Sequence, residues 1–184
     1  NNITIIGKGK GKTTILGGFY VNNTQNVKIE QLSVTNETGD GLYCRGTWTN
    51  VDVTECCFKQ CRHDGMVMRE GATGTATGCE FLENGKYGVV CGGENTNARF
   101  HNCKMHHNGY DGLHASDVAV VDLYGTKTDI HSNKRRGIYV VCRAKVNVRL
   151  ASQHNTSHDN VGEDRMTHFD GLITNINGDG THSL

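Results

Sequence analysis

Six side chains that can bind or transform an acidic sugar occur within thirty positions of this sequence: Tyr110, Asp111, His114, Arg135, Arg136 and Tyr139. Aromatic rings lie against sugar faces, carboxylates bind hydroxyls, and arginine holds a uronate carboxylate through two parallel hydrogen bonds. In an enzyme, Tyr110 or His114 would transfer a proton, Asp111 would orient the base, and either arginine would neutralise the uronate. The first five residues are therefore the candidate catalytic set, and Tyr139 is a candidate ligand-binding residue.

Three histidines form a second group, because each stands two residues before an asparagine in successive segments: His106, His131 and His158. If these segments are neighbouring parallel strands, the imidazoles lie about 5 Å apart and face outward. Neutral imidazole both donates and accepts, so the three can share a metal or a glycan hydroxyl. The alternative is a solvated turn column, which the lack of a matching carboxylate cluster favours. We retain the three histidines as candidate ligand-binding residues and assign no metal to them.

Acidic residues stand directly before several glycines in the same frame: Asp40, Asp64, Asp111 and Asp170. Aspartate before glycine is favourable turn chemistry, which suffices to explain Asp40 and Asp170. We predict that Asp64 belongs to a ligand-binding edge.

Two familiar site motifs are excluded by spacing. The stretch Gly7 to Thr13 lacks the four residues that a phosphate loop needs between its glycines. The eight cysteines show no zinc-type pairing, and Cys56, Cys79 and Cys103 instead recur at one period as small core residues would. Stacked cysteines are close enough to form disulfides, but buried free thiols are the favoured interpretation.

The elements that position these residues are revealed by a repeat. A glycine followed by an apolar residue, any residue and a mostly apolar residue occurs at Gly18, Gly41, Gly65, Gly88, Gly112, Gly137 and Gly171. The steps between these glycines are 23, 24, 23, 24, 25 and 34 residues, a period typical of stacked structural repeats.

Three further columns share this period. Seven residues before the glycines stand Val34, Phe58, Phe81, Met105 and Ile130, with Cys56, Cys79, Cys103 and Thr128 two positions earlier on the same face. Three residues after the first column stand Glu37, Cys61, Asn84, Asn108 and Asn133. Amides stacked about 4.8 Å apart can bond to one another, which predicts an asparagine ladder.

The segments between these columns alternate with period two, as in Val51 to Val53 and Val146 to Val148. We therefore predict an all-β solenoid of about seven coils, with three short parallel strands per coil. The pattern N-x-x-x-G followed by an apolar strand, at Asn84 to Val89, Asn108 to Leu113 and Asn133 to Ile138, resembles the right-handed parallel β-helix of the pectin-lyase-like superfamily.

This resemblance implies carbohydrate chemistry but completes no catalytic set. Epimerases of the superfamily carry Y-G-F-D-P-H-D on the glycine strand, whereas Tyr87 to Gly92 keeps only the first Tyr-Gly pair. The motifs of polygalacturonases are absent. The calcium site of pectate lyases has a faint counterpart in Asp111 with Arg135 or Arg136, so no cofactor is assigned and calcium is possible.

The balance of charged residues limits the classes of binding partner. Lysine plus arginine equals aspartate plus glutamate at 19 each, which disfavours nucleic acid or an anionic membrane as a partner. We expect residues 1–184 to be one β-helix domain, a piece of a longer chain, with an inserted loop at 161–168. The open first coil suggests an end-to-end or homo-oligomeric contact. The sequence assigns no compartment.

Three functions remain open. The first is a non-catalytic recognition module that binds a glycan or a protein along its coils. The second is a lyase or epimerase acting on an acidic polysaccharide. The third is a structural fibre or viral component in which only stacking matters.

Overall fold

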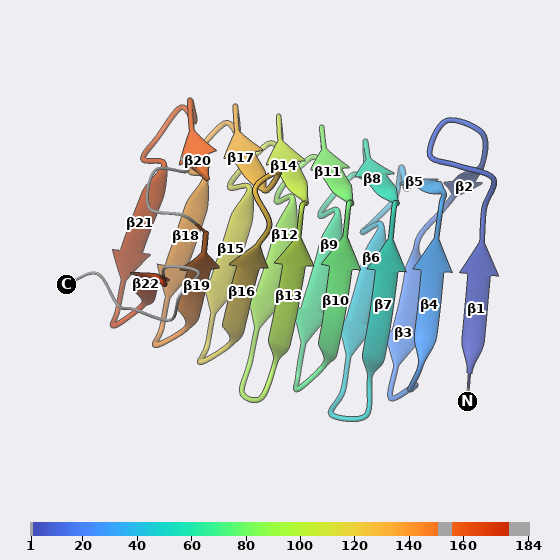
Figure 1. The fold of residues 1–184 in the computed structure, drawn as a ribbon, viewed down its shortest axis with the longest axis horizontal. Coiled ribbons are helices and arrows are strands. Elements are labelled where there is room, and N and C mark those ends of the chain that lie inside the picture. The colour runs from blue at the N-terminus through green and yellow to red at the C-terminus, as the bar shows by residue number, and fades with distance from the viewer. Residues whose placement is uncertain (1, 151–155, 177–184) are drawn as a thin grey trace.

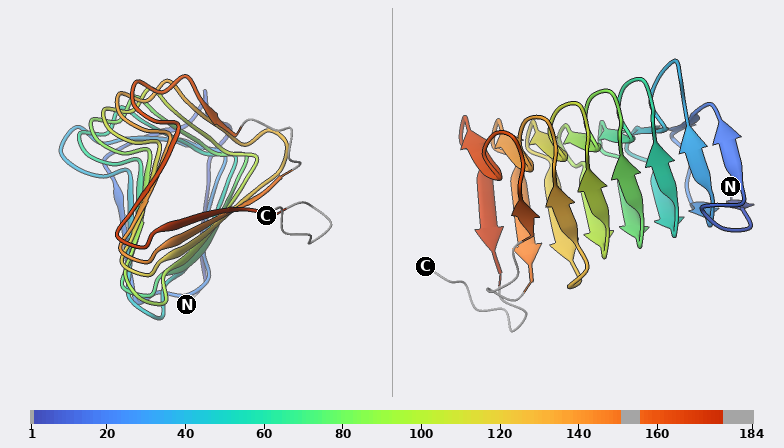
Figure 2. Two further views of the ribbon diagram at one scale, coloured as in Figure 1. Left: turned by 90° about the vertical axis from the view of Figure 1, so that its left-hand side faces the viewer. Right: turned by 90° about the horizontal axis from the view of Figure 1, so that it is seen from above.

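The protein is described here by a computed structural model covering residues 2–150 and 156–176. The strands in these residues form three sheets, each built of parallel strands, that run the length of the molecule (Figure 1). Viewed along the long axis, the coils superimpose as a triangle with one sheet on each side (Figure 2). The predicted all-β fold, with about seven coils and three strands per coil, is confirmed.

The three sheets, of eight, seven and seven strands, are named A, B and C. Sheet A contains β1 (Ile3–Ile6), β4 (Val27–Glu30), β7 (Asn50–Thr54), β10 (Thr73–Thr77), β13 (Asn97–His101), β16 (Val120–Tyr124), β19 (Lys145–Arg149) and β22 (Leu172–Asn175). Sheet B contains β2 (Thr14–Leu16), β5 (Ser33–Thr35), β8 (Cys57–Lys59), β11 (Glu80–Leu82), β14 (Lys104–His106), β17 (Asp129–His131) and β20 (Ser157–His158). Sheet C contains β3 (Phe19–Asn22), β6 (Leu42–Arg45), β9 (Met66–Arg69), β12 (Val89–Gly92), β15 (Leu113–Ser116), β18 (Ile138–Val141) and β21 (Arg165–His168).

The core consists of stacked columns of apolar side chains. The predicted column runs in register from Val34 on β5 to Ile130 on β17, and all five of its members are fully buried. Within it, the rings of Phe58 and Phe81 stack with centroids 5.4 Å apart and planes 8° from parallel. Such a pair contributes about 0.5–1.5 kcal/mol beyond the burial of its area.

The cysteine column lies on the same inner side. Cys56, Cys79 and Cys103 are buried with at most 1% of their surface exposed, and the structure contains them as free thiols. Their Sγ atoms donate to backbone carbonyls of the preceding coil, such as Cys103 to Ala76 O at 3.3 Å. These cysteines therefore fill the core as the sequence predicts.

The repeat glycines are required by the close stacking of the turns before sheet C. A Cβ on Gly88 would lie 2.6 Å from the carbonyl oxygen of Gly112 and 2.8 Å from Nδ2 of Asn108. Real Cβ atoms do not approach backbone oxygens so closely, so only glycine allows successive coils to meet here.

The asparagine ladder is confirmed and extends over four coils. Nδ2 of Asn84 donates to Oδ1 of Asn108 at 3.0 Å, and the same contact recurs from Asn108 to Asn133 and from Asn133 to Asn160 at 2.9 Å. In the second coil, the sequence pattern placed Glu37 in the column of the ladder asparagines, and this prediction is wrong. Asn36 occupies the position, because its Nδ2 lies against Gly18 and donates to Asp40 O at 2.7 Å.

The last coil also differs from the prediction. Residues 165–168 form β21, which pairs with β18, so the inserted loop expected at 161–168 is absent. Asp164 takes the place of the repeat glycine, and the strand after Gly171 is β22 of sheet A. The additional residues of this coil lie before β20, in the connection from β19. His158 follows its partner His131 by 27 residues, against 25 for His131 and His106, and the connection from β19 to β20 includes 151–155, outside the described residues.

Three large apolar side chains of the first coil are exposed. Ile3, Ile6 and Leu16 are 43%, 63% and 85% exposed. No helix in the described ranges is long and apolar enough to cross a membrane.

Candidate functional site

The candidate catalytic residues come together where the turns from sheet B enter sheet C. Tyr110 and Asp111 precede β15, Arg135 and Arg136 precede β18, and His114 pairs in register with Tyr139 on the outer face of sheet C. We call this group, together with Tyr87, the aromatic–arginine surface. Because the coils are stacked in register, residues 25 positions apart become direct neighbours.

Ring contacts connect the members of this surface. The ring of His114 lies 5.3 Å from that of Tyr139 and 5.1 Å from that of Tyr87, centroid to centroid. The guanidinium of Arg136 lies 4.1 Å from the Tyr139 ring centroid, and that of Arg135 lies 5.4 Å from the Tyr110 ring centroid. These distances are those of cation–π contacts, which hold both guanidinium groups against aromatic faces.

Asp111 lies beneath this surface and is fully buried. Its Oδ1 accepts a hydrogen bond from the backbone N–H of Arg136 at 3.0 Å. Its Oδ2 has no hydrogen-bond partner among the described residues and lies 3.8 Å from Nδ1 of His114. Nη1 of Arg136, which is also buried and without such a partner, lies 3.8 Å from Oδ1. A buried carboxylate placed in this way favours a fixed orientation of the His114 ring and of the Arg136 guanidinium.

Tyr87 was not among the predicted site residues, although it occupies the position before a repeat glycine, between Asp64 and Asp111 in the column. Its ring is 5.3 Å from that of Tyr110. Burial raises the pKa of Tyr87, and the negative charge of Asp111 raises it further. Tyr87 therefore stays protonated and able to donate at neutral pH. Its position directly before a repeat glycine, shared with Asp64 and Asp111, was the sequence signal that could have identified Tyr87 as a site residue.

Asp64 lies in the same column, two coils before Asp111. Its Oδ1 accepts from the backbone N–H of Tyr87 at 3.0 Å, as Oδ1 of Asp40 accepts from the N–H of Asp64. Burial raises the pKa of Asp64, and the charge of Asp40 adds to this effect. Asp64 thus caps the next coil from beside the aromatic–arginine surface.

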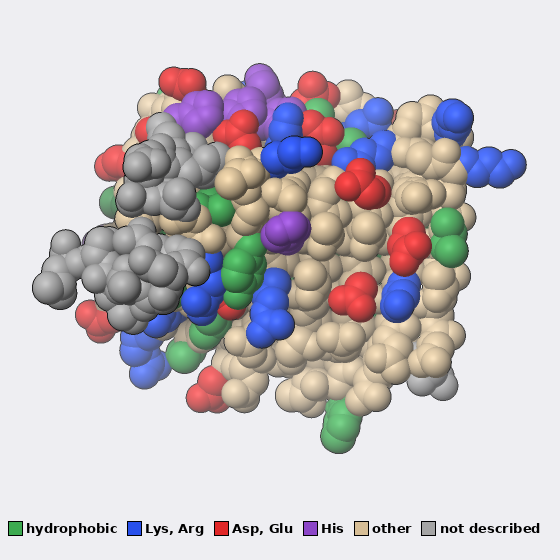
Figure 3. Space-filling model, viewed as in Figure 1, with side chains coloured by type: hydrophobic (Ala, Val, Ile, Leu, Met, Phe, Trp, Pro, Cys, Tyr) green, Lys and Arg blue, Asp and Glu red, His purple; other side chains and the backbone are tan. Residues whose placement is uncertain are grey.

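The three histidines form a continuous stack on sheet B. The rings of His106 and His131 are 4.9 Å apart and 3° from parallel, and those of His131 and His158 are 5.4 Å apart and 9° from parallel. We call them the histidine row. Histidine side chains gather along the upper edge of the molecule over β14, β17 and β20 (Figure 3). The row lies on a different sheet from His114 and Tyr139.

Carboxylates flank this row, although the sequence had indicated none. Oε1 of Glu80 bonds to Nε2 of His106 at 2.9 Å, and Oδ1 of Asp129 bonds to Nε2 of His158 at 3.0 Å. Both acids occupy the first position of a sheet B strand, two residues before the histidine position. Each therefore points outward beside the row, and the period-two alternation of β11 and β17 was the signal for them.

The ring geometry limits what the row can bind. Nearly parallel imidazoles direct their nitrogen lone pairs along parallel lines, so adjacent rings do not converge on one ion. Within residues 2–150 and 156–176, no group of three or more histidine, cysteine or acidic side chains is arranged to hold a metal ion.

The stacked coils, the three parallel sheets and the internal asparagine ladder together define a parallel β-helix repeat protein. A family model described as right handed beta helix region matches residues 12–162. The chain belongs to this right-handed β-helix family.

Among solved structures, the A-module of the mannuronan C-5 epimerase AlgE6 from Azotobacter vinelandii is similar. The two share 14% sequence identity with a TM-score of 0.49, over 89% of this chain and 63% of that one. The present chain thus corresponds to less than two thirds of that module. A comparison with curated protein sequences finds no match.

Proposed function

We propose that this chain is a non-catalytic recognition module that binds an acidic glycan along the aromatic–arginine surface. The observation that carries the proposal is the pairing of each arginine with a tyrosine ring, Arg135 with Tyr110 and Arg136 with Tyr139. The guanidinium of Arg135 is exposed and forms no ion pair with the described residues, so it keeps donors free for a uronate carboxylate, while the neighbouring rings offer apolar faces to the sugar. Arg136 is more enclosed, with Nη1 3.8 Å from Oδ1 of Asp111 and Nε 3.6 Å from Oε2 of Glu163.

The rigidity of the scaffold supports recognition. The backbone groups of each strand are bonded to the coils on both sides, and the buried asparagine ladder stiffens the turns that carry Tyr110 and Arg135. Side chains that are already held in place lose little freedom on binding, which favours affinity for an extended ligand. A protein partner is the alternative ligand for the same surface.

Binding to a polyuronate, compared with its methyl-esterified form, tests the proposal. Arg135→Gln and Tyr110→Ala alter exposed side chains and are expected to weaken binding by about tenfold each, as for loss of a charge-assisted hydrogen bond or a ring contact. Arg143→Gln removes an exposed arginine from the turn between β18 and β19 and should bind normally. Equal binding of the polyuronate and its ester, or unchanged binding by both site variants, would contradict the proposal.

The contact between Asp111 and His114 supports a second candidate, a lyase or epimerase. In that reaction His114 or Tyr110 would remove the proton beside the uronate carboxylate, Asp111 would hold the histidine ring, and Arg136 would stabilise the charge on the carboxylate. A lyase would then expel the glycosidic oxygen and leave an unsaturated uronate, whereas an epimerase would return the proton to the opposite face.

Incubation with a panel of acidic polysaccharides separates the two candidates. Catalysis should produce ultraviolet absorbance from unsaturated uronate or a change in epimer content, and Tyr110→Phe and His114→Gln should abolish it. A panel that stays unchanged while binding persists favours the recognition module. If binding is also absent, the structural role becomes the better explanation.

A further inference from the structure

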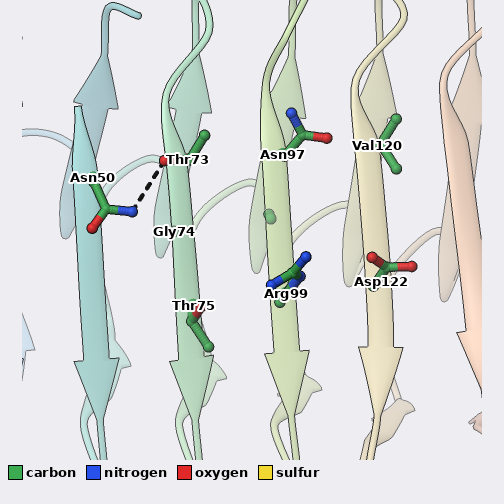
Figure 4. A pocket seen from close by; sticks show the side chains of 9 residues that line it. Asn50, Thr73, Gly74, Thr75, Asn97, Arg99, Val120 and Asp122 are labelled. Atoms are coloured by element: carbon green, nitrogen blue, oxygen red, sulfur yellow. Dashed lines mark hydrogen bonds between the residues drawn. The ribbon is translucent and has the colours of Figure 1, made fainter. Parts of the chain in front are cut away.

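A groove on the outer face of sheet A contains a second set of polar side chains, which neither proposal above uses. It has a volume of about 390 Å³ and crosses four strands, β7, β10, β13 and β16 (Figure 4). Its lining consists of Asn50, Thr73, Gly74, Thr75, Asn97, Ala98, Arg99, Val120 and Asp122. We call it the Arg99 groove.

Arg99 is the notable residue of this groove. It pairs in register with Thr75 on one side and Asp122 on the other, so its guanidinium stands in the middle of the lining. Asp122 forms its ion pair with Arg149 rather than with Arg99, since its Oδ1 accepts from Nε of Arg149 at 2.9 Å and from Nδ2 of Asn147 at 2.9 Å. No carboxylate in the described residues forms an ion pair with Arg99.

The other lining residues offer hydrogen bonds without charge. Asn50, Thr73, Thr75 and Asn97 carry amides and hydroxyls, and Asn50 Nδ2 donates to Thr73 Oγ1 at 3.1 Å (Figure 4). No aromatic ring lines the groove. The strands of its floor are paired on both sides, so an extended peptide cannot add to the sheet through its backbone. A ligand here is recognised by side chains alone.

A second hollow continues the groove toward the start of the chain. It has a volume of about 200 Å³ and shares Thr75 with the first, and it adds Lys28, Glu30, Asp52, Thr54 and Thr77. Together the two hollows cross five coils of sheet A, from β4 to β16. Their carboxylates accept from hydroxyls, while Arg99 supplies an unpaired cation at one end.

We infer that the Arg99 groove is a second binding site, which takes a short carboxylated saccharide with its uronate group on Arg99 and its hydroxyls on the threonine and asparagine side chains. The planar guanidinium bonds a carboxylate through two donors, and the remaining polar lining matches hydroxyls rather than apolar groups. The site lies on a different sheet from the aromatic–arginine surface and does not depend on the function proposed for it.

Titration of ¹⁵N-labelled protein with an oligosaccharide of three uronate residues tests the assignment. Saturable shifts are expected for the backbone amides of Thr75, Asn97 and Arg99, and the methyl ester of the same oligosaccharide should lose them. Arg99→Gln should weaken this binding at least tenfold, whereas Arg143→Gln should not change it. Because Arg99 is exposed, its replacement should leave the unfolding temperature unchanged.

Several outcomes would overturn the assignment. These are the absence of saturable shifts, shifts confined to β15 and β18, unchanged binding by Arg99→Gln, or equal binding of a triglutamate peptide. The double variant Arg135→Gln/Tyr110→Ala separates the two sites, since it should abolish polymer binding at the aromatic–arginine surface and leave the shifts on sheet A intact. Failure of one site thus does not imply failure of the other.

Discussion

The two carboxylate oxygens of Asp111 have different roles: one bonds to the backbone of the next coil, and the other faces His114 in the candidate site. Oδ1 accepts the backbone N–H of Arg136 one coil further on, at 3.0 Å, while Oδ2 lies 3.8 Å from Nδ1 of His114. The first contact is equivalent to the hydrogen bond that Asp64 accepts from the backbone N–H of Tyr87, so it is a repeated structural contact between coils. The second places a buried negative charge under the aromatic–arginine surface.

Substitutions at Asp111 should therefore separate stability from ligand binding. Asp111→Ala removes the acceptor of a buried N–H and is expected to lower the free energy of unfolding by about 1–3 kcal/mol. Asp111→Asn keeps an acceptor oxygen and should lose clearly less stability, yet it removes the charge that orients the His114 ring and the Arg136 guanidinium, so it should weaken polyuronate binding. Chemical denaturation and binding assays on both variants measure this, and equal stability losses would contradict the division of roles.

The asparagine ladder should be a major source of stability. Oδ1 of Asn108 accepts from Nδ2 and from the backbone N–H of Asn84, and its own Nδ2 donates to Phe81 O. Asn108→Ala leaves several buried groups unpaired, so we expect a loss of about 3 kcal/mol in the free energy of unfolding. Asn22→Ala, at an exposed position, is the matched control. Similar unfolding midpoints for the two variants would show that the ladder contributes little.

The sequence predicted which residues stack, because a period of about 24 residues repeats the same side-chain type at the same place in each coil. Phe58 above Phe81, Asn84 above Asn108 and His106 above His131 were all predicted from their columns and confirmed. The asparagine and histidine columns were visible because one residue type dominates each of them.

The sequence did not predict features that depend on turn length or on side-chain orientation. A period does not say to which sheet a strand belongs. Because Asp164 stands where the last coil would carry its glycine, Gly171 was taken for the repeat glycine before sheet C, although it precedes β22 of sheet A. The Arg99 groove was missed because its column changes residue type at every coil, with Thr75 and Arg99 as direct neighbours. Spacing also carries no information on which oxygen of Asp111 is free.

The histidine row should make stability depend on pH in two opposite ways. Burial lowers the pKa of His131, and the charges of His106 and His158 lower it further while Asp129 opposes them. The hydrogen bond to Asp159 raises the pKa of His158, an effect that burial opposes and Asp129 reinforces. A lowered pKa means that protonating His131 destabilises the fold, whereas protonation of His158 stabilises it.

Thermal unfolding between about pH 5 and pH 8 should resolve the two contributions, since histidine titrates in this range. His131→Gln should reduce the loss of stability that occurs as the pH falls. His158→Gln should remove stabilisation that is present below the unfolded-state pKa of histidine and is lost as the pH rises through the higher folded-state value. Parallel pH profiles for the two variants would show that the neighbouring Glu80, Asp129 and Asp159, together with His107, set the dependence instead.

The thiols should be almost inert in the folded protein. Burial raises the pKa of Cys44 to about 12, with a small contribution from Cys91, and burial raises that of Cys91 to about 12 as well. The thiolate is the reactive species, so these groups are scarcely ionised at neutral pH. Cys142 is the one free cysteine that is partly exposed among the described residues. Thiol titration of native protein should therefore label Cys142 quickly and the other seven only after unfolding, and Cys142→Ser should remove the fast phase. Rapid native labelling of Cys44 or Cys91 would show that the coils open locally.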